Sequence, residues 1–464
     1  MSRLVGWLSR QDGSLMFIAF AVASAIVLGG GGSPAPLAEM ILQVLLALAF
    51  VGWFWTAPRK TVVSASPMVW VLAGVVLALP LAQLIPLPPS VWQALPGRAD
   101  EKAALDLIGQ GQSWQAISIA PYRTWSALLA MVGPVAFMVV GASLSPSPRA
   151  IVLAIIGAMA GLSILVGAAQ LGGGMWSFLR FYSPDSTMLD GFQANHNAQA
   201  DLLLIAMVAL TTVLVDMKVF AVLRRRLHLL TALLILTIVF VCAIVLTGSR
   251  AGMALIPLAL AGQLAILWPL LALSRRGIML GVAGLLLAVA GAGLMVESNT
   301  ALGGAVSRFR QGDPLRPEIW QNTLYAIKAN LPLGTGMGTF IPAYTAAEKL
   351  ETVTEQLINR AHDDYLELAL EGGIPALVLA LFVVTCVVWR AWPLRSGGDL
   401  VLRSQRICAS VGLMVIGLHS IVDYPLRAMS LACVAGLLTG FLFSARANQA
   451  SALQRPLGEV KESL

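Results

Sequence analysis

The chain has 464 residues, of which 58% are hydrophobic and only 11% are charged, and its formal net charge is +7. Because a soluble domain carries about 25% charged residues, this composition excludes a soluble multidomain enzyme, a disordered chain and a coiled coil. Long apolar runs instead predict an all-α polytopic membrane protein. The four cysteines each lie in an apolar run and form no CxxC pair, so neither a zinc site nor a disulfide framework is expected.

About twelve stretches have the length of a transmembrane helix, which needs roughly 20 mostly apolar residues. The first stretch follows two arginines and fits a secretory signal, but we interpret it as an uncleaved span because the topology requires one. The spans are expected near residues 14–30, 38–57, 67–87, 124–144, 150–171, 198–217, 228–247, 252–273, 277–296, 374–392, 405–424 and 428–445. The chain then divides into residues 1–296 with spans 1–9, a large loop at 297–373, residues 374–445 with spans 10–12, and a tail at 446–464.

Lysine and arginine are distributed unevenly between the two sets of loops. One set contains 18 basic and five acidic residues, and the other contains 12 basic and 18 acidic residues. The short loops are decisive, since residues 31–37 have no lysine or arginine and residues 223–227 have three arginines. The positive-inside rule therefore places both termini in the cytoplasm. The basic charge lies beside anionic lipid of the bilayer, and no nucleic-acid partner is needed to explain it.

The loop at 297–373, on the far side of the membrane, is long enough to carry structure of its own. A first helix is expected from Pro317 to Asn330, followed by a glycine-rich turn over 331–340. A second helix is expected from Asp363 to Glu371, and the glycine pair at 372–373 ends it before the tenth span.

Charged groups are nearly absent from the middle of the spans, and the deepest acid, Asp201, lies about one turn from the far-side end of the sixth span. Ion-coupled transporters place ionisable residues or broken helices near the midplane. The pattern therefore disfavours a transporter and directs the search for function to the far side.

Several polar clusters lie on that side, and each has a plainer structural alternative. Asn195 and Asn197 precede the sixth span, where asparagines also cap helices. Arg250 lies between two apolar helices with almost no loop, so it sits at the membrane boundary, where snorkelling to lipid headgroups is the alternative. His362 heads the second loop helix and is followed by two carboxylates that would raise its basicity, although a lone loop histidine is more often structural.

Two further clusters complete the set. Arg316 opens the run Arg-Pro-Glu-Ile-Trp, and glycines follow it at 334–338. These glycines superficially suggest a nucleotide loop, but no strand precedes them and the loop lies outside the cytoplasm, so a tight turn is favoured. His419 and Asp423 are four residues apart, so we expect them to share a helix face as a structural pair, with catalysis as the alternative.

In their order, these elements resemble the O-antigen ligase and polymerase superfamily, whose members transfer glycans from a polyprenyl diphosphate carrier on the periplasmic side of the membrane. The resemblance covers mainly residues 190–430, and it rests on TGSRAG at 247–252, RPEIW at 316–320, NLPLGTGMGTF at 330–340 and HDDYLELALEGG at 362–373. It implies a GT-C-like fold of about 12 transmembrane helices with a large helical periplasmic loop between spans 9 and 10.

By position, the resemblance implies that Arg250, Arg316 and His362 are the essential residues. The family's histidine motif has Asn directly after His, whereas this chain has Asp363 there. The implied enzyme is a metal-independent glycosyltransferase of the bacterial inner membrane with no cofactor. Its donor is an undecaprenyl diphosphate-linked glycan.

The residue types suit this chemistry. Arg250 and Arg316 present forks of donors that match diphosphate oxygens and stay charged at membrane depth. His362 is expected to accept the proton of the acceptor hydroxyl, with Asp363 as the rival base, and a single displacement would invert the anomeric centre. The residues expected to contact substrate are Asn195, Asn197, Asp363 and Tyr365. No cluster has metal-ligand spacing, so no metal is expected.

Several functions remain open at this stage. A ligase attaches a finished glycan to lipid A core, a polymerase joins repeat units into O-antigen or exopolysaccharide, and a third variant transfers the glycan to protein. A transporter or flippase of lipid-linked glycan and a structural membrane subunit are the alternatives outside enzymology.

Overall fold

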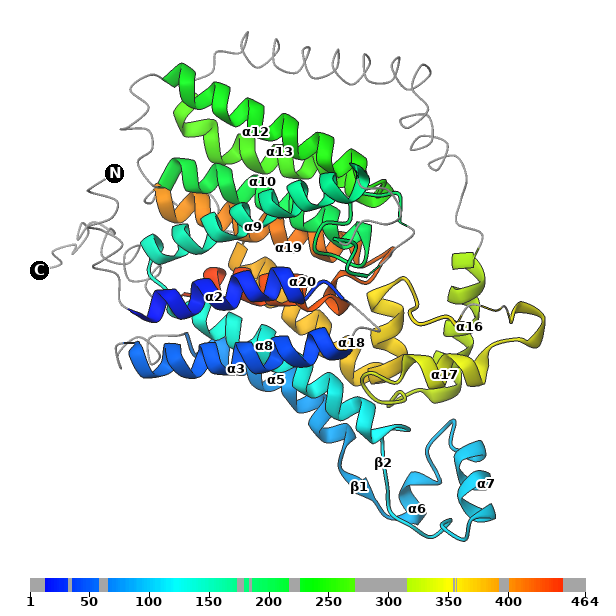
Figure 1. Ribbon diagram of the computed structural model, residues 1–464. Helices are drawn as coiled ribbons and strands as arrows, with labels where there is room; N and C mark the ends of the chain where they lie inside the picture. Colours follow the sequence, from blue (N-terminus) through cyan, green and yellow to red (C-terminus); the bar gives the residue numbers. More distant parts are fainter. Residues whose placement is uncertain are drawn as a thin grey trace, which may run out of the picture.

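The computed structural model describes residues 13–31, 36–57, 66–172, 179–182, 186–216, 226–271, 315–353, 355, 357–391 and 400–444. Within these ranges the chain is all-α apart from the two-residue strands β1 (Pro86–Leu87) and β2 (Gln115–Ala116), which pair antiparallel. Eleven apolar helices form a bundle, shown in Figure 1. They are α2 (Gly13–Leu28), α3 (Pro36–Thr56), α5 (Pro67–Gln83), α8 (Pro121–Ser143), α9 (Pro146–Gly172), α10 (His196–Asp216), α12 (Arg226–Leu246), α13 (Arg250–Leu271), α18 (Asp364–Ala391), α19 (Leu400–His419) and α20 (Met429–Leu442).

Seven of these described helices are long and apolar enough to cross a membrane, and the other four contain shorter apolar helices. The eleven helices coincide with eleven of the twelve predicted spans, and the predicted ninth span, at 277–296, lies outside the described residues. The expectation of an all-α polytopic membrane protein is confirmed.

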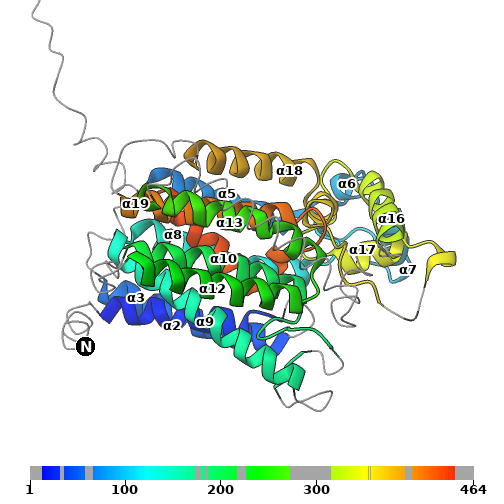
Figure 2. The same cartoon turned by 90° about the horizontal axis from the view of Figure 1, so that it is seen from above.

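Helix α10 lies in the middle of the bundle. It packs against α9 and α12 on one side and α13 and α19 on the other, as Figure 2 shows from above. Within an 18-residue apolar stretch of α10, 89% of the residues are buried inside the protein. A helix that is apolar on every side is expected in such a central position. Its packing therefore fixes the position of its first turn, which begins at His196.

Helix α19 ends earlier than the sequence predicts. The predicted span runs over 405–424, whereas the helix covers Leu400–His419 and a turn follows it. The short helix η3 (Pro425–Arg427) then leads into α20. The predicted helix face shared by His419 and Asp423 is therefore wrong, because Asp423 lies beyond the last helical residue.

Two groups of short elements lie at one end of the bundle in Figure 1. One consists of β1, α6 (Pro89–Trp92), α7 (Ala99–Leu107) and β2. The other consists of α16 (Leu315–Asn330), α17 (Phe340–Ala347) and the 3-10 helix η2 (Leu350–Thr352). The second group packs with the first turns of α18 around a separate apolar core, which includes Ile319, Phe340 and, from α18, Leu370. The described part of the large loop is thus structured, as predicted, with one helix close to each predicted position.

Helix α18 is kinked at Gly373, where the backbone has φ 59° and ψ −152°. A Cβ atom at this position would lie 2.2 Å from the carbonyl oxygen of Pro332, so only glycine fits the turn. The N–H of Ile374 donates to the same carbonyl at 2.8 Å. The glycine pair thus separates a loop helix from an apolar helix, as the sequence predicts, within one continuous element.

Candidate active site

The turn after α19 places Asp423 at the centre of polar contacts from distant segments. His362 Nδ1 lies 3.4 Å from Asp423 Oδ1. The side-chain amides of Asn195 and Asn197 both donate to Asp423 Oδ2, the former at 3.2 Å. Arg316 Nη1 donates to the carbonyl of Val422 at 2.5 Å. The loop before α10, the start of α16, the segment before α18 and the turn after α19 therefore meet at one point.

His362 has a backbone conformation that is uncommon for residues other than glycine. Its φ is 52°, in the left-handed region, and it is the one non-glycine residue with positive φ in the described ranges. Its ring packs edge-on against Tyr424, with centroids 5.0 Å apart. Non-glycine residues in this region carry strain of about 1–3 kcal/mol and cluster at functional sites.

The His362 and Asp423 side chains differ sharply in exposure, at 31% and 2%. Neither His362 Nδ1 nor Asp423 Oδ1 hydrogen-bonds any other group in the described part of the chain. These two atoms are therefore each other's natural partners, and a small adjustment would close the 3.4 Å gap between them to a hydrogen bond.

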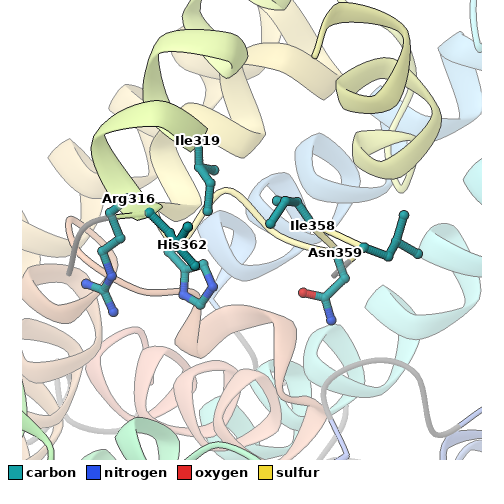
Figure 3. A pocket seen from close by; sticks show the side chains of 7 residues that line it. Arg316, Ile319, Ile358, Asn359 and His362 are labelled. Atoms are coloured by element: carbon teal, nitrogen blue, oxygen red, sulfur yellow. The ribbon is translucent and has the colours of Figure 1, made fainter. Parts of the chain in front are cut away.

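Arg316 and His362 line one cavity of about 280 Å³. In Figure 3 the guanidinium of Arg316, the imidazole of His362 and the amide of Asn359 point to the same side. The rest of the lining is aliphatic, from Leu315, Ile319, Leu357 and Ile358. The cavity thus combines a fixed cation, a titratable ring and an amide with an apolar wall.

The electrostatics of the site keep Asp423 ionised. Burial alone would raise its pKa, but the approach of the His362 ring and the electrostatic influence of His419 and Arg316 outweigh burial and lower the pKa to about 2. Burial and the neighbouring Asp423 carboxylate raise the pKa of Tyr424 to about 12. Asp423 is therefore a fixed anion beside His362, and Tyr424 stays protonated at neutral pH.

Arg250 is placed at the same end of the bundle, at the first residue of α13. The turn before it includes Gly248 with φ 67°, and Ser249 Oγ accepts the N–H of Gly252 at 3.0 Å. A Cβ atom on Gly252 would lie 2.5 Å from the Cβ of Ala200, so α13 begins against the first turns of α10. Among the described residues, those lining the cavity include Arg316 and His362 but not Arg250.

Asp363 and Tyr365 make local structural contacts. Asp363 Oδ1 accepts the backbone N–H of Tyr365 at 2.8 Å and of Leu366 at 3.0 Å, which is the geometry of a helix N-cap. The Tyr365 hydroxyl donates to the carbonyl of Gly417 at 2.8 Å and so ties α18 to α19. Both side chains thus have a role in holding the start of α18.

His419 pairs with a residue from another helix. Its Nδ1 lies 2.6 Å from Asp201 Oδ1, and both side chains are almost fully buried, at 1% and 0% exposure. This pair joins the end of α19 to the first turns of α10. The sequence predicts His419 and Asp423 as partners by their spacing. In the structure His419 instead pairs with Asp201 of α10, and Asp423 lies beside His362.

A second polar cluster lies on one face of α18 and was not predicted. Asp364, Glu367 and Glu371 share this face, and Arg427 reaches all three carboxylates at 3.6, 3.3 and 2.9 Å respectively. Arg360 Nη1 also contacts Glu367, at 2.7 Å. Burial alone would lower the pKa of Arg427, but these carboxylates outweigh it and raise the pKa above its ordinary value. The three-and-four spacing of the acids was visible in the sequence, but their arginine partners were not.

No group of three or more histidine, cysteine, aspartate or glutamate side chains in the described ranges is arranged to hold a metal ion. The fold and the site define a multi-pass membrane protein in which a basic, histidine-containing cavity opens at one end of the helical bundle.

The model of the O-antigen ligase family matches residues 232–381. This match supports the resemblance seen in the motifs, and the matched residues include Arg250, Arg316 and His362. The family indicates a glycosyltransferase-type enzyme of the ligase and polymerase class, acting on glycans and lipid-linked substrates at a membrane. No curated protein matches the chain.

Proposed function

We propose that the protein transfers a glycan from an undecaprenyl diphosphate carrier to an acceptor hydroxyl on the periplasmic side of the bacterial inner membrane. The observation that supports this most directly is that Arg316 and His362 line one cavity and both contact the turn at Val422 and Asp423. A guanidinium suits the diphosphate, and an imidazole suits the acceptor hydroxyl.

Arg316 binds the diphosphate of the donor at the mouth of the cavity. The positive charge of Arg316 stabilises the transition state most as the sugar–phosphate bond breaks, because the leaving group then gains negative charge. Arg250 supplies a second cation from the start of α13. The apolar wall formed by Leu315, Ile319 and Leu357 suits the region where the carrier's headgroup joins its lipid.

His362 is the general base. Asp423 holds Nδ1 of the ring, so the other ring nitrogen accepts the acceptor proton while the acceptor oxygen attacks the anomeric carbon. The bond from that carbon to the phosphate oxygen breaks, and its electron pair leaves with the diphosphate. One displacement of this kind inverts the anomeric configuration. No step requires a metal ion or a cofactor.

The mechanism is the same for several classes of acceptor. Lipid A core defines a ligase, the end of a growing glycan defines an O-antigen or exopolysaccharide polymerase, and a protein hydroxyl defines an O-oligosaccharyltransferase. The same base and cations serve all three. Both termini lie in the cytoplasm in this proposal, because the basic loops lie on their side.

The test is reconstitution of the purified protein in vesicles with a fluorescent polyprenyl diphosphate glycan and each acceptor class. Release of polyprenyl diphosphate together with a glycan-extended acceptor is expected, in the presence of a metal chelator. Movement of intact donor across the vesicle without consumption would instead identify a flippase. Transfer that requires added divalent metal would contradict the metal-independent mechanism.

A further inference from the structure

Glu367 occupies a position where two functional loops meet. It lies on α18 with a fully buried side chain. Its Oε1 contacts Arg360 Nη1 at 2.7 Å and Arg427 Nε at 3.3 Å. Its Oε2 accepts the backbone N–H of Ala361 at 3.3 Å. One carboxylate is thus bonded to two residues that directly precede His362 and to one that shortly follows Asp423.

From these contacts we infer that Glu367 is a positioning residue for the transfer reaction, holding the segment that carries His362 and the turn that carries Asp423 in register. The inference rests on the proposed role of His362. Each loop is attached within a few residues of its functional side chain, so a shift of either attachment moves His362 relative to Asp423.

The neighbouring acids on the same face attach the rest of the turn. Asp364 Oδ2 accepts the hydroxyl of Ser420 at 2.9 Å and the N–H of Leu426 at 3.2 Å. The N–H of Asp364 itself donates to the carbonyl of Ser420 at 2.9 Å. Both ends of the turn around Asp423 are therefore bound to the first turns of α18, beside the Glu367 anchor.

The physical chemistry favours a geometric role for this cluster over a purely stabilising one. Burying charged pairs carries a large desolvation penalty, and apolar packing often stabilises a fold equally well. The cluster instead restricts geometry, because the planar guanidinium groups of Arg360 and Arg427 bind the carboxylates only in certain orientations and so fix the orientation of both loops. His362 also needs restraint, since a left-handed backbone is uncommon for residues other than glycine.

The test compares Glu367→Gln with Glu371→Gln. Glu371 is an equally buried carboxylate on the same face, and it contacts Arg427 and the N–H of Phe340 but not the segment at 360–362. Both variants are expected to lose thermal stability. In Glu367→Gln the kcat per folded molecule should fall about 100-fold with little change in donor KM, as expected for a misplaced base. Glu371→Gln should retain a markedly higher kcat.

A second readout does not depend on the donor. Diethyl pyrocarbonate labels accessible histidines, and mass spectrometry resolves His362 from the exposed His228, which serves as an internal reference. Relative labelling of His362 should rise about threefold in Glu367→Gln through local opening of its segment, and should stay at the wild-type value in Glu371→Gln. If wild-type protein shows no transfer, the proposed function fails, while this labelling still tests the anchor.

Should Glu367→Gln not fold, Arg360→Gln removes the 2.7 Å contact from a partly exposed position. It should show the same two effects to a smaller extent, and Arg360→Lys should restore most of the kcat. Equal kcat values and equal labelling in Glu367→Gln and Glu371→Gln would overturn the inference, as would wild-type behaviour of Arg360→Gln.

Discussion

His362 Nδ1 lies 3.4 Å from Asp423 Oδ1, although the two residues belong to segments on opposite sides of α18 and α19 in the sequence. The carboxylate is buried and ionised, and the ring is partly exposed to the cavity. A fixed anion behind one ring nitrogen orients the ring and stabilises the protonated form that arises during base catalysis. This relationship makes Asp423 the most informative residue that the motif analysis left out of the proposed machinery.

Asp423→Asn is expected to lower kcat about 100-fold, because it keeps the side-chain size and removes the charge that supports the base. Initial rates of glycan transfer measure this. Since the pKa of Asp423 is about 2, below its ordinary value, the carboxylate is ionised at both pH 6 and pH 8, and the loss should be similar at the two pH values.

The matched control is Asp363→Asn, because asparagine caps a helix as well as aspartate does. Near-normal transfer is expected from it. Strong loss in Asp363→Asn together with normal rates in Asp423→Asn would show that the base and its partner are misassigned.

Arg316→Ala is expected to reduce kcat/KM for the carrier-linked donor by about 10- to 100-fold, the value of a charge-assisted hydrogen bond to phosphate. Steady-state transfer kinetics provide the measurement. Lys328→Ala removes a cation from the exposed face of the same helix and should leave the kinetics unchanged. Equal behaviour of the two variants would remove Arg316 from the donor site.

Arg250→Ala should also reduce kcat/KM for the donor by about 10- to 100-fold while leaving membrane insertion intact, because the side chain supplies the second proposed contact to the diphosphate. Transfer and membrane-fraction yield are measured on the same preparation. Arg123→Ala is the comparison, since Arg123 lies in the first turn of another apolar helix, α8, where it donates to the Tyr122 hydroxyl. If Arg250→Ala transfers glycan as well as Arg123→Ala does, the role of Arg250 is limited to its boundary position.

Asp190→Asn should change how stability depends on pH. Burial raises the pKa of Asp190 to about 6, although the Ser186 hydroxyl and the charge of Arg180 lower it. Between pH 4 and pH 6 the folded protein therefore holds more protons than the unfolded chain, and the stability of the wild type falls as pH rises. Thermal unfolding in detergent should show the variant gaining midpoint temperature over the wild type from pH 4 to pH 7. A constant difference would contradict this.

The bundle could be predicted from the sequence because long charge-free runs are local properties. The first helix of the large loop, its glycine turn and the break between two helices at the glycine pair 372–373 were also predicted, since proline and glycine act locally. The end of α19 was misplaced because apolar residues continue into the turn after His419.

The pairings of the site were beyond such reasoning. His419 and Asp423 have the spacing of a helical pair, yet the first binds Asp201 and the second lies beside His362. Packing between α10 and α19 decides these partners, and a single sequence does not contain it. Asp363 had a local signature, since an aspartate at the start of a helix commonly caps it, and this accounts for its contacts without substrate.

Helix α18 bends at Gly373, between the part that contacts the loops and the apolar part in the bundle, and the N–H of Ile374 at this bend donates to the carbonyl of Pro332. The same helix therefore carries both the buried carboxylates that bind Arg360 and Arg427 and an apolar surface suited to lipid chains. Bilayer thickness acts on the part of α18 after Gly373, and the bend separates the part before Gly373 from tilting of that segment. A change in membrane thickness would therefore have to alter the bend at Gly373 before it moved the residues around His362.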